Sequence, residues 1–235
     1  MEPRKIKVMT LNIRNYHNFE ARKPKIIALI RKHNPDIVAL QEARDDRSKN
    51  QEGMDQATQL NQELQYPHFT FLPATDMNKA KGLTDRPLCY EGIALLSKFP
   101  FSSEEFSLQK HKDDIYERKV LIGYVKLDNK QIPFFIVHFS PNDLFARLHA
   151  EQTLEYAEKI QPIIIGDLNI RSSEVEKLSK KHNFTSSTTY KYISFPEDKC
   201  SYDYILLPKY ASFLSFTCLS DEVSDHRAII AEITV

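Results

Sequence analysis

Residues 163–169 read Ile-Ile-Ile-Gly-Asp-Leu-Asn, an apolar run that ends in the polar side chains of Asp167 and Asn169. A buried strand has this apolar character, and polar side chains at its end are exposed in the following loop. Further polar motifs lie near the ends of apolar runs: Leu-Asn-Ile at Asn12, Gln-Glu at Glu42, Val-His at His138, Tyr-Asp-Tyr-Ile at Asp203, and Ser-Asp-His at Asp225 and His226. The sequence therefore predicts strands whose ends present carboxylate, amide and imidazole groups.

The carboxylates in these motifs predict a metal site if the fold brings them together. They belong to Glu42, Asp167, Asp203 and Asp225. Crowded carboxylates repel one another, so they either raise their pKa values or bind a cation. Oxygen ligands without a cysteine favour a hard ion, Mg²⁺ or Mn²⁺. Histidines beside such an ion are typical of hydrolytic phosphate sites.

Length and composition favour one folded domain. The 235 residues fit one large or two small domains, and with 41% hydrophobic and 27% charged residues the chain can form a sizeable core. No internal repeat or long linker divides it, so we interpret residues 1–235 as a single domain. The formal net charge is +0. No overall positive field attracts the protein to nucleic acid, and such binding would need a local patch.

The sequence contains no recognisable targeting or membrane segment. The chain begins Met-Glu-Pro-Arg-Lys without a hydrophobic secretory core, and no apolar run reaches membrane-spanning length. Cys89, Cys200 and Cys218 are odd in number and widely spaced, which suits neither a disulfide framework nor a zinc site. We therefore expect a cytoplasmic protein, and we expect it to be a monomer.

Hydrophobic periodicity predicts strands and helices that alternate, with hairpins between some strands. Strands are expected at residues 6–13, 36–40, 68–72, 91–96, 115–127, 131–139, 163–165, 202–207, 212–218 and 228–235, and helices at 20–33, 52–64 and 174–181. A further helix is expected after residues 140–143, which resemble a capping box that starts at Ser140. Residues 76–88 are expected to form a polar loop. The mixture predicts an α/β (α+β) protein with mixed sheets covered by helices, rather than a doubly wound parallel sheet.

Taken in order, the motifs resemble the endonuclease/exonuclease/phosphatase superfamily, the deoxyribonuclease I-like family. The resemblance covers nearly the whole chain and includes Leu-Asn-Ile-Arg at Asn12, Gln-Glu after Asp-Ile-Val, Glu-Gly-Ile-Ala at Glu91, Gly-Asp-Leu-Asn and Ser-Asp-His. Each motif is weak to moderate alone, and their combination in the correct order is specific. The resemblance implies a four-layer α/β/β/α sandwich, with two mixed sheets flanked by helices and the site at one rim between the sheets.

The resemblance also implies which residues bind the metal and the substrate. Glu42 would be the principal ligand of Mg²⁺ or Mn²⁺, with Asn12 and Asp225 beside it. Arg14 and Arg118 would bind substrate phosphates, whose oxygens match the two-point geometry of an arginine fork.

Catalysis would be carried, by the same resemblance, by Glu91, His138, Asp167, Asn169, Asp203 and His226. Asp167 would orient or deprotonate the attacking water, and Asn169 would donate a hydrogen bond to the developing phosphorane oxygens. His226 would contact the phosphate or accept the water proton, with Asp203 fixing its tautomer. His138 would face the phosphate from the other side, oriented by Glu91.

Several residues have ordinary alternative interpretations. The alternative for Glu91 is an ordinary outward-facing strand glutamate, and the alternative for Asp203 is a surface charge on an edge strand; the functional interpretation is favoured for both. The aromatic side chains of Tyr190, Tyr192 and Phe195 are able to stack on bases, insert among lipid headgroups or cover the edge of a sheet, and the last use needs no ligand.

The function that we expect is metal-dependent phosphodiester hydrolysis by a nuclease, which cleaves DNA or RNA through in-line attack of an activated water. The alternative is a phosphodiesterase or phosphatase for a lipid headgroup, similar to a sphingomyelinase, or for a small phosphate metabolite. A non-enzymatic binding protein on this scaffold would lack a catalytic residue, and none is missing. A basic strip beside the site would favour nucleic acid, and an exposed aromatic hairpin would favour lipid.

Overall fold

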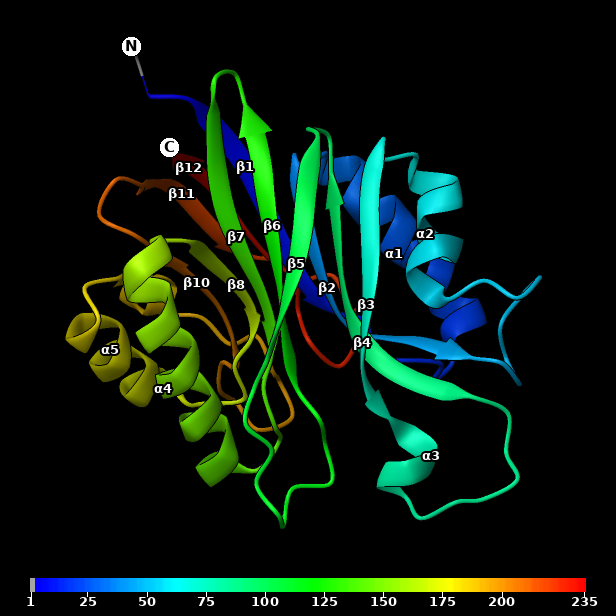
Figure 1. The fold of residues 1–235 in the computed structure, drawn as a ribbon. Helices are drawn as coiled ribbons and strands as arrows, with labels where there is room; N and C mark the ends of the chain where they lie inside the picture. The colour runs from blue at the N-terminus through cyan, green and yellow to red at the C-terminus, as the bar shows by residue number, and fades with distance from the viewer. Residues whose placement is uncertain (1–2) are drawn as a thin grey trace.

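Two six-stranded sheets pack face to face in the centre of the molecule (Figure 1). The structure is a computed structural model that describes residues 3–235. One sheet has the strand order β11-β12-β1-β2-β4-β3, and the other has the order β5-β6-β7-β8-β10-β9. Strand β1 is parallel to β2, β7 is parallel to β8, and the other neighbouring strands are antiparallel. Both sheets are therefore mixed, as the sequence predicts.

The strand bounds place Asn12, His138, Asp167 and Asp203 at strand ends, whereas Glu42 lies within a strand. The first sheet contains β1 (Lys5–Asn12), β2 (Ile37–Asp46), β3 (His68–Asp76), β4 (Cys89–Ser97), β11 (Ser212–Cys218) and β12 (Ile229–Thr234). The second contains β5 (Phe101–Ser107), β6 (Lys119–Leu127), β7 (Lys130–His138), β8 (Ile163–Asp167), β9 (Thr185–Ser186) and β10 (Asp203–Leu207).

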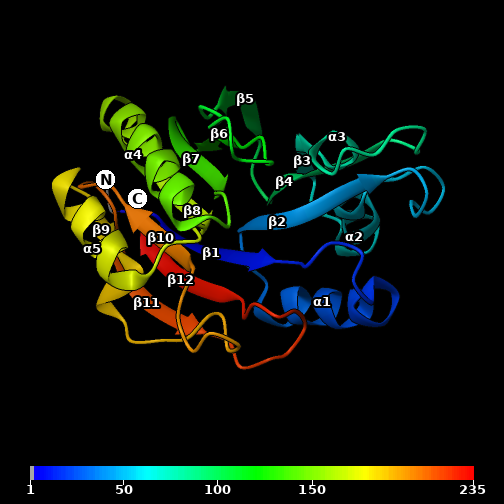
Figure 2. The same cartoon turned by 90° about the horizontal axis from the view of Figure 1, so that it is seen from below.

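Helices cover the outer face of each sheet, which completes the four-layer sandwich (Figures 1 and 2). The first sheet is covered by α1 (Phe19–His33) and α2 (Gln56–Leu64), and the second by α4 (Asp143–Ile160) and α5 (Ser172–Lys181). A single helical turn, α3 (Met77–Ala80), follows β3, and a short 3-10 helix, η1 (Ser187–Thr189), follows β9. None of the helices within residues 3–235 is long and apolar enough to cross a membrane.

Successive residues of the central strands face two different cores. Ile163 and Ile165 of β8 belong to the cluster between the sheets, whereas Ile164 belongs to the cluster beneath α4 and α5. In β1, Val8 faces the neighbouring sheet and Met9 faces α1 and α2. Because both faces are buried at these positions, Val8-Met9 and Ile163-Ile164-Ile165 are consecutive apolar residues rather than alternating ones.

Several predicted elements need correction. Strand β5 was not predicted, because its sequence Phe-Ser-Ser-Glu-Glu-Phe-Ser lies at a sheet edge and is mostly solvent-exposed, so it has no apolar pattern. The predicted loop at 76–88 contains α3, whose first turn is capped by the Asp76 carboxylate. Helix α4 is capped by Asn142 rather than Ser140. Strand β6 begins at Lys119 rather than at residue 115, and β2 continues to Asp46 instead of ending at residue 40.

Candidate active site

Glu42 lies at a bulge in the middle of β2. The pairing of β2 with β4 changes register between Gln41 and Ala43, and Glu42 between them has a left-handed backbone with φ of 54°. A bulge redirects the side chain of the extra residue, and a left-handed glutamate is uncommon outside sites where the surroundings hold it in place. The bulge therefore interrupts the alternation of side chains along β2 at Glu42, so its carboxylate does not point where a regular strand would place it.

Asn12 connects the carboxylates of the two sheets. It ends β1 beside β2, and its Nδ2 donates to Glu42 Oε1 at 3.1 Å and to Asp167 Oδ2 at 3.0 Å. Asn15 donates to the other Glu42 oxygen, Oε2, at 2.9 Å. Arg14 Nε lies 2.9 Å from Asp225 Oδ2. The metal ligands predicted from the resemblance are thus neighbours in one network.

Arg22 of α1 holds the loop that carries these residues. Its guanidinium donates to five backbone carbonyls, those of Ile13, Arg14, Asn15, His17 and Val223. Arg14 and Asn15 both have left-handed backbones, a conformation that persists only when neighbouring groups impose it. The Val223 contact also joins this loop to the segment that carries Asp225. Burial lowers the pKa of Arg22.

The second sheet brings three polar residues together through strand register. His138 at the end of β7 pairs with Asp167 at the end of parallel β8, and Asp203 at the start of β10 pairs with Asp167 from the other side. Gly166 precedes Asp167 with φ of 149°, and a Cβ there would lie 2.0 Å from the carbonyl oxygen of Val137. Only glycine fits this position, so the close approach of β7 and β8 at the site depends on it.

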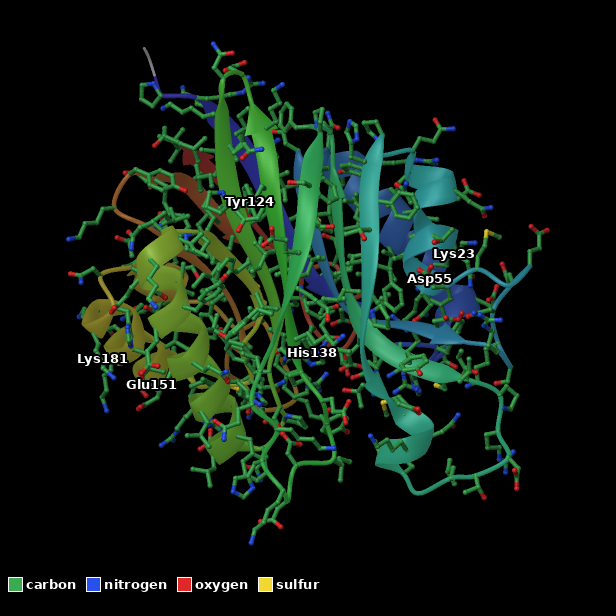
Figure 3. All side chains as sticks on the ribbon, viewed as in Figure 1. Lys23, Asp55, Tyr124, His138, Glu151 and Lys181 are labelled. Carbon is green, nitrogen blue, oxygen red and sulfur yellow. The ribbon has the colours of Figure 1, made fainter. Side chains whose placement is uncertain are left out.

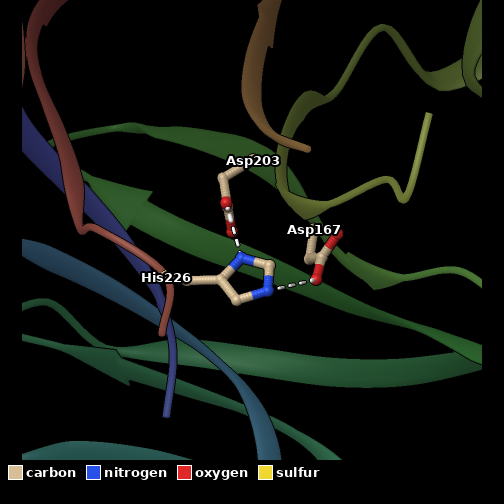
Figure 4. Close-up of side chains that lie close together, drawn as sticks. All are labelled: Asp167, Asp203 and His226. Atoms are coloured by element: carbon tan, nitrogen blue, oxygen red, sulfur yellow. Dashed lines mark hydrogen bonds and ion pairs between the residues drawn. The ribbon is translucent and has the colours of Figure 1, made fainter. Parts of the chain in front are cut away.

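His226 lies between two aspartates, as Figure 4 shows. Its Nδ1 is 2.8 Å from Asp203 Oδ2, and its Nε2 is 3.8 Å from Asp167 Oδ2. A carboxylate only accepts hydrogen bonds, so Nδ1 of His226 carries a proton. The Phe195 ring packs against the imidazole at 4.7 Å between centroids. Asp203 therefore orients His226 as the resemblance implies.

His138 has a different neighbour on its Nδ1. Arg118 Nη1 lies 3.1 Å from His138 Nδ1, and because arginine only donates, Nδ1 accepts and Nε2 carries the proton. His138 Nε2 is 3.8 Å from Asp167 Oδ2. Glu91 contacts Arg118 at 3.3 Å and Arg44 at 2.8 Å. The link from Glu91 to His138 thus passes through Arg118. Figure 3 shows His138 well inside the molecule, far from the labelled Glu151 and Lys181 on the outer helices.

Burial and neighbouring charges shift several pKa values in the site. Burial, opposed by nearby His226, raises the pKa of Asp167 to about 7. Burial alone would lower the pKa of His226, but Asp203 and Asp167 outweigh it and raise the pKa to about 10. Burial and the positive charge of Arg118 lower the pKa of His138 well below its ordinary value. Burial and the charge of Glu91 raise the pKa of Glu42, with its amide partners opposing the rise.

The Glu42 environment fits a divalent cation. This half-buried carboxylate has amide donors, Asn12 and Asn15, but no cationic side chain within ion-pair distance among residues 3–235. Glu42 and Asp225 would both bind a metal through carboxylate oxygens, the ligand atoms that Mg²⁺ and Mn²⁺ prefer. Asp167, Asp203 and His226 also place ligand atoms within 4.8 Å of one another, and the hydrogen bond between His226 and Asp203 accounts for much of that closeness.

The structure places all of the predicted site residues around Asp167 and Glu42. Asn169 has a left-handed backbone, its N–H donates to Asp167 Oδ1 at 2.9 Å, and its Nδ2 donates to the Phe139 carbonyl at 3.1 Å. Arg118, predicted to bind substrate, is only 4% exposed and already contacts Glu91 and His138. The individual roles remain predictions, because geometry alone does not test them.

Sequence reasoning missed three residues that hold the site together, Asn15, Arg22 and Arg44. Asn15 follows Asn12 in the same polar stretch, and that proximity is a usable signal. Arg44 was placed beyond the predicted end of its strand, although β2 continues past it. Arg22 belongs to the predicted helix at residues 20–33, and no local pattern distinguishes it from the other charged residues there.

A buried carboxylate between two histidines, beside a second carboxylate suited to a cation, defines a hydrolytic site for phosphate esters. The sequence profile of the Endonuclease/Exonuclease/phosphatase family matches residues 9–226, a span that contains every residue of the site. The chain belongs to this family, whose members are hydrolases that act on phosphoester bonds. A search of curated proteins found no significant match.

Solved structures share the fold at low sequence identity. An endonuclease/exonuclease/phosphatase from Beutenbergia cavernae is 17% identical with a TM-score of 0.76, over 99% of this chain and 72% of that one. A mannosyl-6-phosphatase from Bacteroides thetaiotaomicron is 17% identical with a TM-score of 0.74, over 98% and 100%. Sphingomyelinase C from Streptomyces griseocarneus is 18% identical with a TM-score of 0.73, over 97% and 99%. These similarities establish the deoxyribonuclease I-like sandwich.

Proposed function

We propose that this protein is a divalent-metal-dependent phosphodiesterase that cleaves nucleic acid. The observation that carries the hydrolytic part is the position of Asp167, whose Oδ2 lies 3.8 Å from Nε2 of both His138 and His226. A water or phosphate oxygen placed between these three side chains would meet one proton acceptor, the Asp167 carboxylate, and two proton donors, the Nε2–H groups of His138 and His226. That combination is what in-line attack on a phosphate ester requires.

Asp167 is the best candidate for the general base. Its pKa of about 7 means that a large fraction is ionised at neutral pH while the group still binds a proton well. General-base catalysis is most effective when the pKa of the base lies near the working pH. The Asn12 and Asn169 hydrogen bonds hold the two carboxylate oxygens in place, so Asp167 does not have to reorganise before it accepts the water proton.

His226 is better suited to stabilise phosphate charge than to accept the proton. With its pKa raised to about 10, the imidazole is a cation at neutral pH. Its Nδ1 proton is held by Asp203, which leaves the Nε2 proton for a phosphate oxygen. Asn169 uses one of its two amide N–H bonds on the Phe139 carbonyl, and the other remains for the developing phosphorane. When bound near Glu42, a divalent ion would supply Lewis-acid stabilisation of the same charge.

The aromatic residues near the site favour nucleic acid over lipid. Tyr190 and Tyr192 each pack on Phe216 of β11 with ring centroids 4.7 Å apart, and Phe195 packs on His226. They therefore cover a sheet edge rather than form a projecting aromatic hairpin. Arg14 remains partly exposed beside Asp225 and has the geometry to bind a phosphate.

One observation favours a lipid-headgroup phosphodiesterase as the second candidate. Ile115, Leu144 and Leu148 are 50%, 60% and 50% exposed, on the loop before β6 and on the first turns of α4. Exposed apolar side chains of this size suit a membrane surface. The acidic side chains Asp113 and Asp143 lie among them in the sequence, which weakens the match to an anionic membrane.

A substrate panel with the full chain tests the proposal. Plasmid DNA, single-stranded RNA, sphingomyelin vesicles and bis-p-nitrophenyl phosphate would each be assayed with Mg²⁺, with Mn²⁺ and with EDTA. We expect cleavage of nucleic acid and of the small diester with metal, and none with EDTA. Cleavage of sphingomyelin without cleavage of nucleic acid would select the second candidate. Metal-independent turnover would contradict the role of the Glu42 region.

Glu42→Gln tests that region directly. We expect hydrolysis to fall to background while the fold, measured by circular dichroism, is retained, because the amide can still accept from Asn12 but no longer contributes negative charge. Calorimetric titration should show weakened Mg²⁺ binding. Glu52→Gln, at an exposed acidic position, is the matched control and should change neither quantity. Unchanged metal affinity in Glu42→Gln would show that Glu42 is not a metal ligand.

A further inference from the structure

A pocket lies between β11 and the segment that precedes β10. Its volume is about 470 Å³, within the range of small-molecule sites. Tyr190 and Phe216, which stack with an interplanar angle of 12°, form part of its wall. Figure 2 shows the chain between β9 and β10 passing alongside β11, where this pocket lies. None of the residues assigned above to catalysis or metal binding lines it.

The pocket contains two cations and no lining acid. Lys191 and Arg227 both line it, and neither has a carboxylate within ion-pair distance among residues 3–235. The Nε atom of Arg227 is buried and has no hydrogen-bond partner. Thr217 and Ser220 add hydroxyl groups to the lining. Two cationic side chains without a paired carboxylate in the described part of the chain line the same pocket, so it is suited to receive an anion.

Two backbone connections place this pocket next to the catalytic centre. Arg227 directly follows His226, and its N–H donates to the Ser194 carbonyl at 2.7 Å. Ile193 lines the pocket, while Phe195, two residues later, packs against the imidazole of His226. The wall between pocket and catalytic centre is therefore only one or two residues thick along each segment.

We propose that this pocket binds one nucleotide unit of the nucleic-acid strand, adjacent to the phosphodiester that is cleaved. The phosphate of that unit would accept from Arg227 and Lys191, and its base would contact the aromatic side chains of the pocket wall. Arginine matches phosphate in a two-point geometry, and bases stack on aromatic rings without strong sequence preference. The assignment to a nucleic-acid strand rests on the proposed nuclease function, but nucleotide binding in the pocket can be tested without catalysis.

Nuclear magnetic resonance of the full chain in EDTA tests binding without turnover. Adenosine 5′-monophosphate, adenosine and inorganic phosphate would be titrated separately while the Arg227 Nε–H signal and the backbone amide signals of Thr217 and Ser220 are followed; the amide signals report on the Arg227→Gln variant as well. We expect the nucleotide to shift this signal at lower concentration than phosphate or adenosine alone. Arg227→Gln and Lys191→Gln should each weaken nucleotide binding by about tenfold, the usual effect of losing one hydrogen bond to a charged group. Lys209→Gln, at an exposed lysine before β11, should have no effect.

Steady-state cleavage distinguishes a nucleotide of a strand from a free mononucleotide. Arg227→Gln and Lys191→Gln should raise KM for an oligonucleotide by about fivefold to tenfold while kinetics on bis-p-nitrophenyl phosphate, which has no neighbouring nucleotide, remain unchanged. Nucleotide binding without this KM effect would overturn the strand assignment and leave a site for free nucleotide. If Arg227→Gln also slows cleavage of the small diester, the substitution has disturbed the neighbouring His226. The KM of Lys191→Gln for the oligonucleotide then tests the strand assignment.

The two proposals fail in different ways. If the wild-type protein cleaves the small diester but no nucleic acid, the proposed function is wrong, and the nucleotide titration still reports on the pocket. If adenosine 5′-monophosphate leaves the Arg227 signal unchanged, or binds Arg227→Gln as well as wild type, the pocket proposal is wrong even for an active nuclease. A response to phosphate equal to the response to nucleotide would overturn the role of the aromatic wall.

Discussion

His138 and His226 lie at the same distance from the Asp167 carboxylate, but their pKa values are shifted in opposite directions. Each Nε2 lies 3.8 Å from Asp167 Oδ2, and each ring is buried. The difference lies on the other nitrogen, where Arg118 faces His138 and Asp203 faces His226. The arginine lowers the pKa of His138, together with burial, and the aspartates raise that of His226 against burial.

Burial lowers the pKa of both histidines; Arg118 adds to this effect at His138, whereas Asp203 and Asp167 reverse it at His226. His138 is neutral with its proton on Nε2, and His226 is a cation that carries protons on both nitrogens. Both therefore present an N–H toward Asp167, but only one brings a positive charge. This asymmetry suits a phosphate site, because a second cation beside His226 would lower the pKa of Asp167 and weaken it as a base.

The largest expected effect comes from breaking the pair of His226 and Asp203. His226→Ala and Asp203→Ala should each lower kcat by about 10²- to 10⁴-fold, and the double variant should lose little more than the worse single. A misoriented histidine is already nearly inactive, so the losses do not add. Asp198→Ala, at an exposed aspartate that contacts Tyr202, is the control. Losses that multiply in the double variant would show that Asp203 does not act through His226.

A smaller loss is expected on the His138 side. Arg118→Lys keeps the charge but replaces the rigid, planar guanidinium, whose Nη1 contacts both Glu91 and His138, by an ammonium group on a flexible stem. The tautomer of His138 is then no longer fixed, and kcat should fall by about 10- to 100-fold. Arg44→Lys, which also loses a contact to Glu91 but does not touch His138, should be nearly unaffected. Equal losses in both variants would assign the effect to Glu91 instead.

Arg22→Gln should affect the His226 side alone, and less strongly. The variant loses most of the contacts that join the Arg14 loop to Val223, so Asp225 and its neighbour shift slightly. We expect kcat to fall roughly fivefold and the Mg²⁺ concentration at half activity to rise, because small displacements of catalytic groups are costly. Imidazole signals of His226 should move in NMR spectra while those of His138 do not. Arg31→Gln on the same helix is the exposed control.

The smallest effect is a difference in how the two histidines link stability to pH. The pKa of His138 is lowered in the fold, so the unfolded chain binds its proton more readily and acidification below about 6.5 destabilises the protein. The pKa of His226 is raised to about 10, so its contribution is complete below about pH 6.5 and is lost as pH rises through 10. Urea unfolding in EDTA should show His138→Gln less sensitive to acid and His226→Gln less sensitive to alkali. The reverse pattern would exchange the two assignments.

Much of the architecture was predictable because the relevant signals are local. Runs such as Ile163 to Ile165 have no polar residue on either face, which indicates burial on both sides. The strand that sequence analysis missed was also missed for a local reason. Strand β5 is polar and exposed at an edge, so it lacks the hydrophobic pattern by which strands are recognised.

The membership of the site was also predictable, because several of its residues are polar groups at the ends of apolar runs and the motifs occur in the order that the family shows. Their contacts were not. Glu91 was expected to orient His138, and the structure places Arg118 between them. Arg118 was expected to reach substrate, and it is buried in that same network. Arg22 was invisible to pattern analysis, because its five acceptors are backbone carbonyls, which every residue has.

The sequence by itself determined most of the strands, since hydrophobic runs are properties of neighbours along the chain, and its resemblance to the family implied the four layers and the set of side chains that meet at the rim. Only the tertiary structure decided the charge of each histidine. Arg118 is 20 residues from His138, and Asp203 is 23 residues from His226. Electrostatic interactions depend on distance and burial in the folded molecule, and neither quantity is encoded in sequence separation.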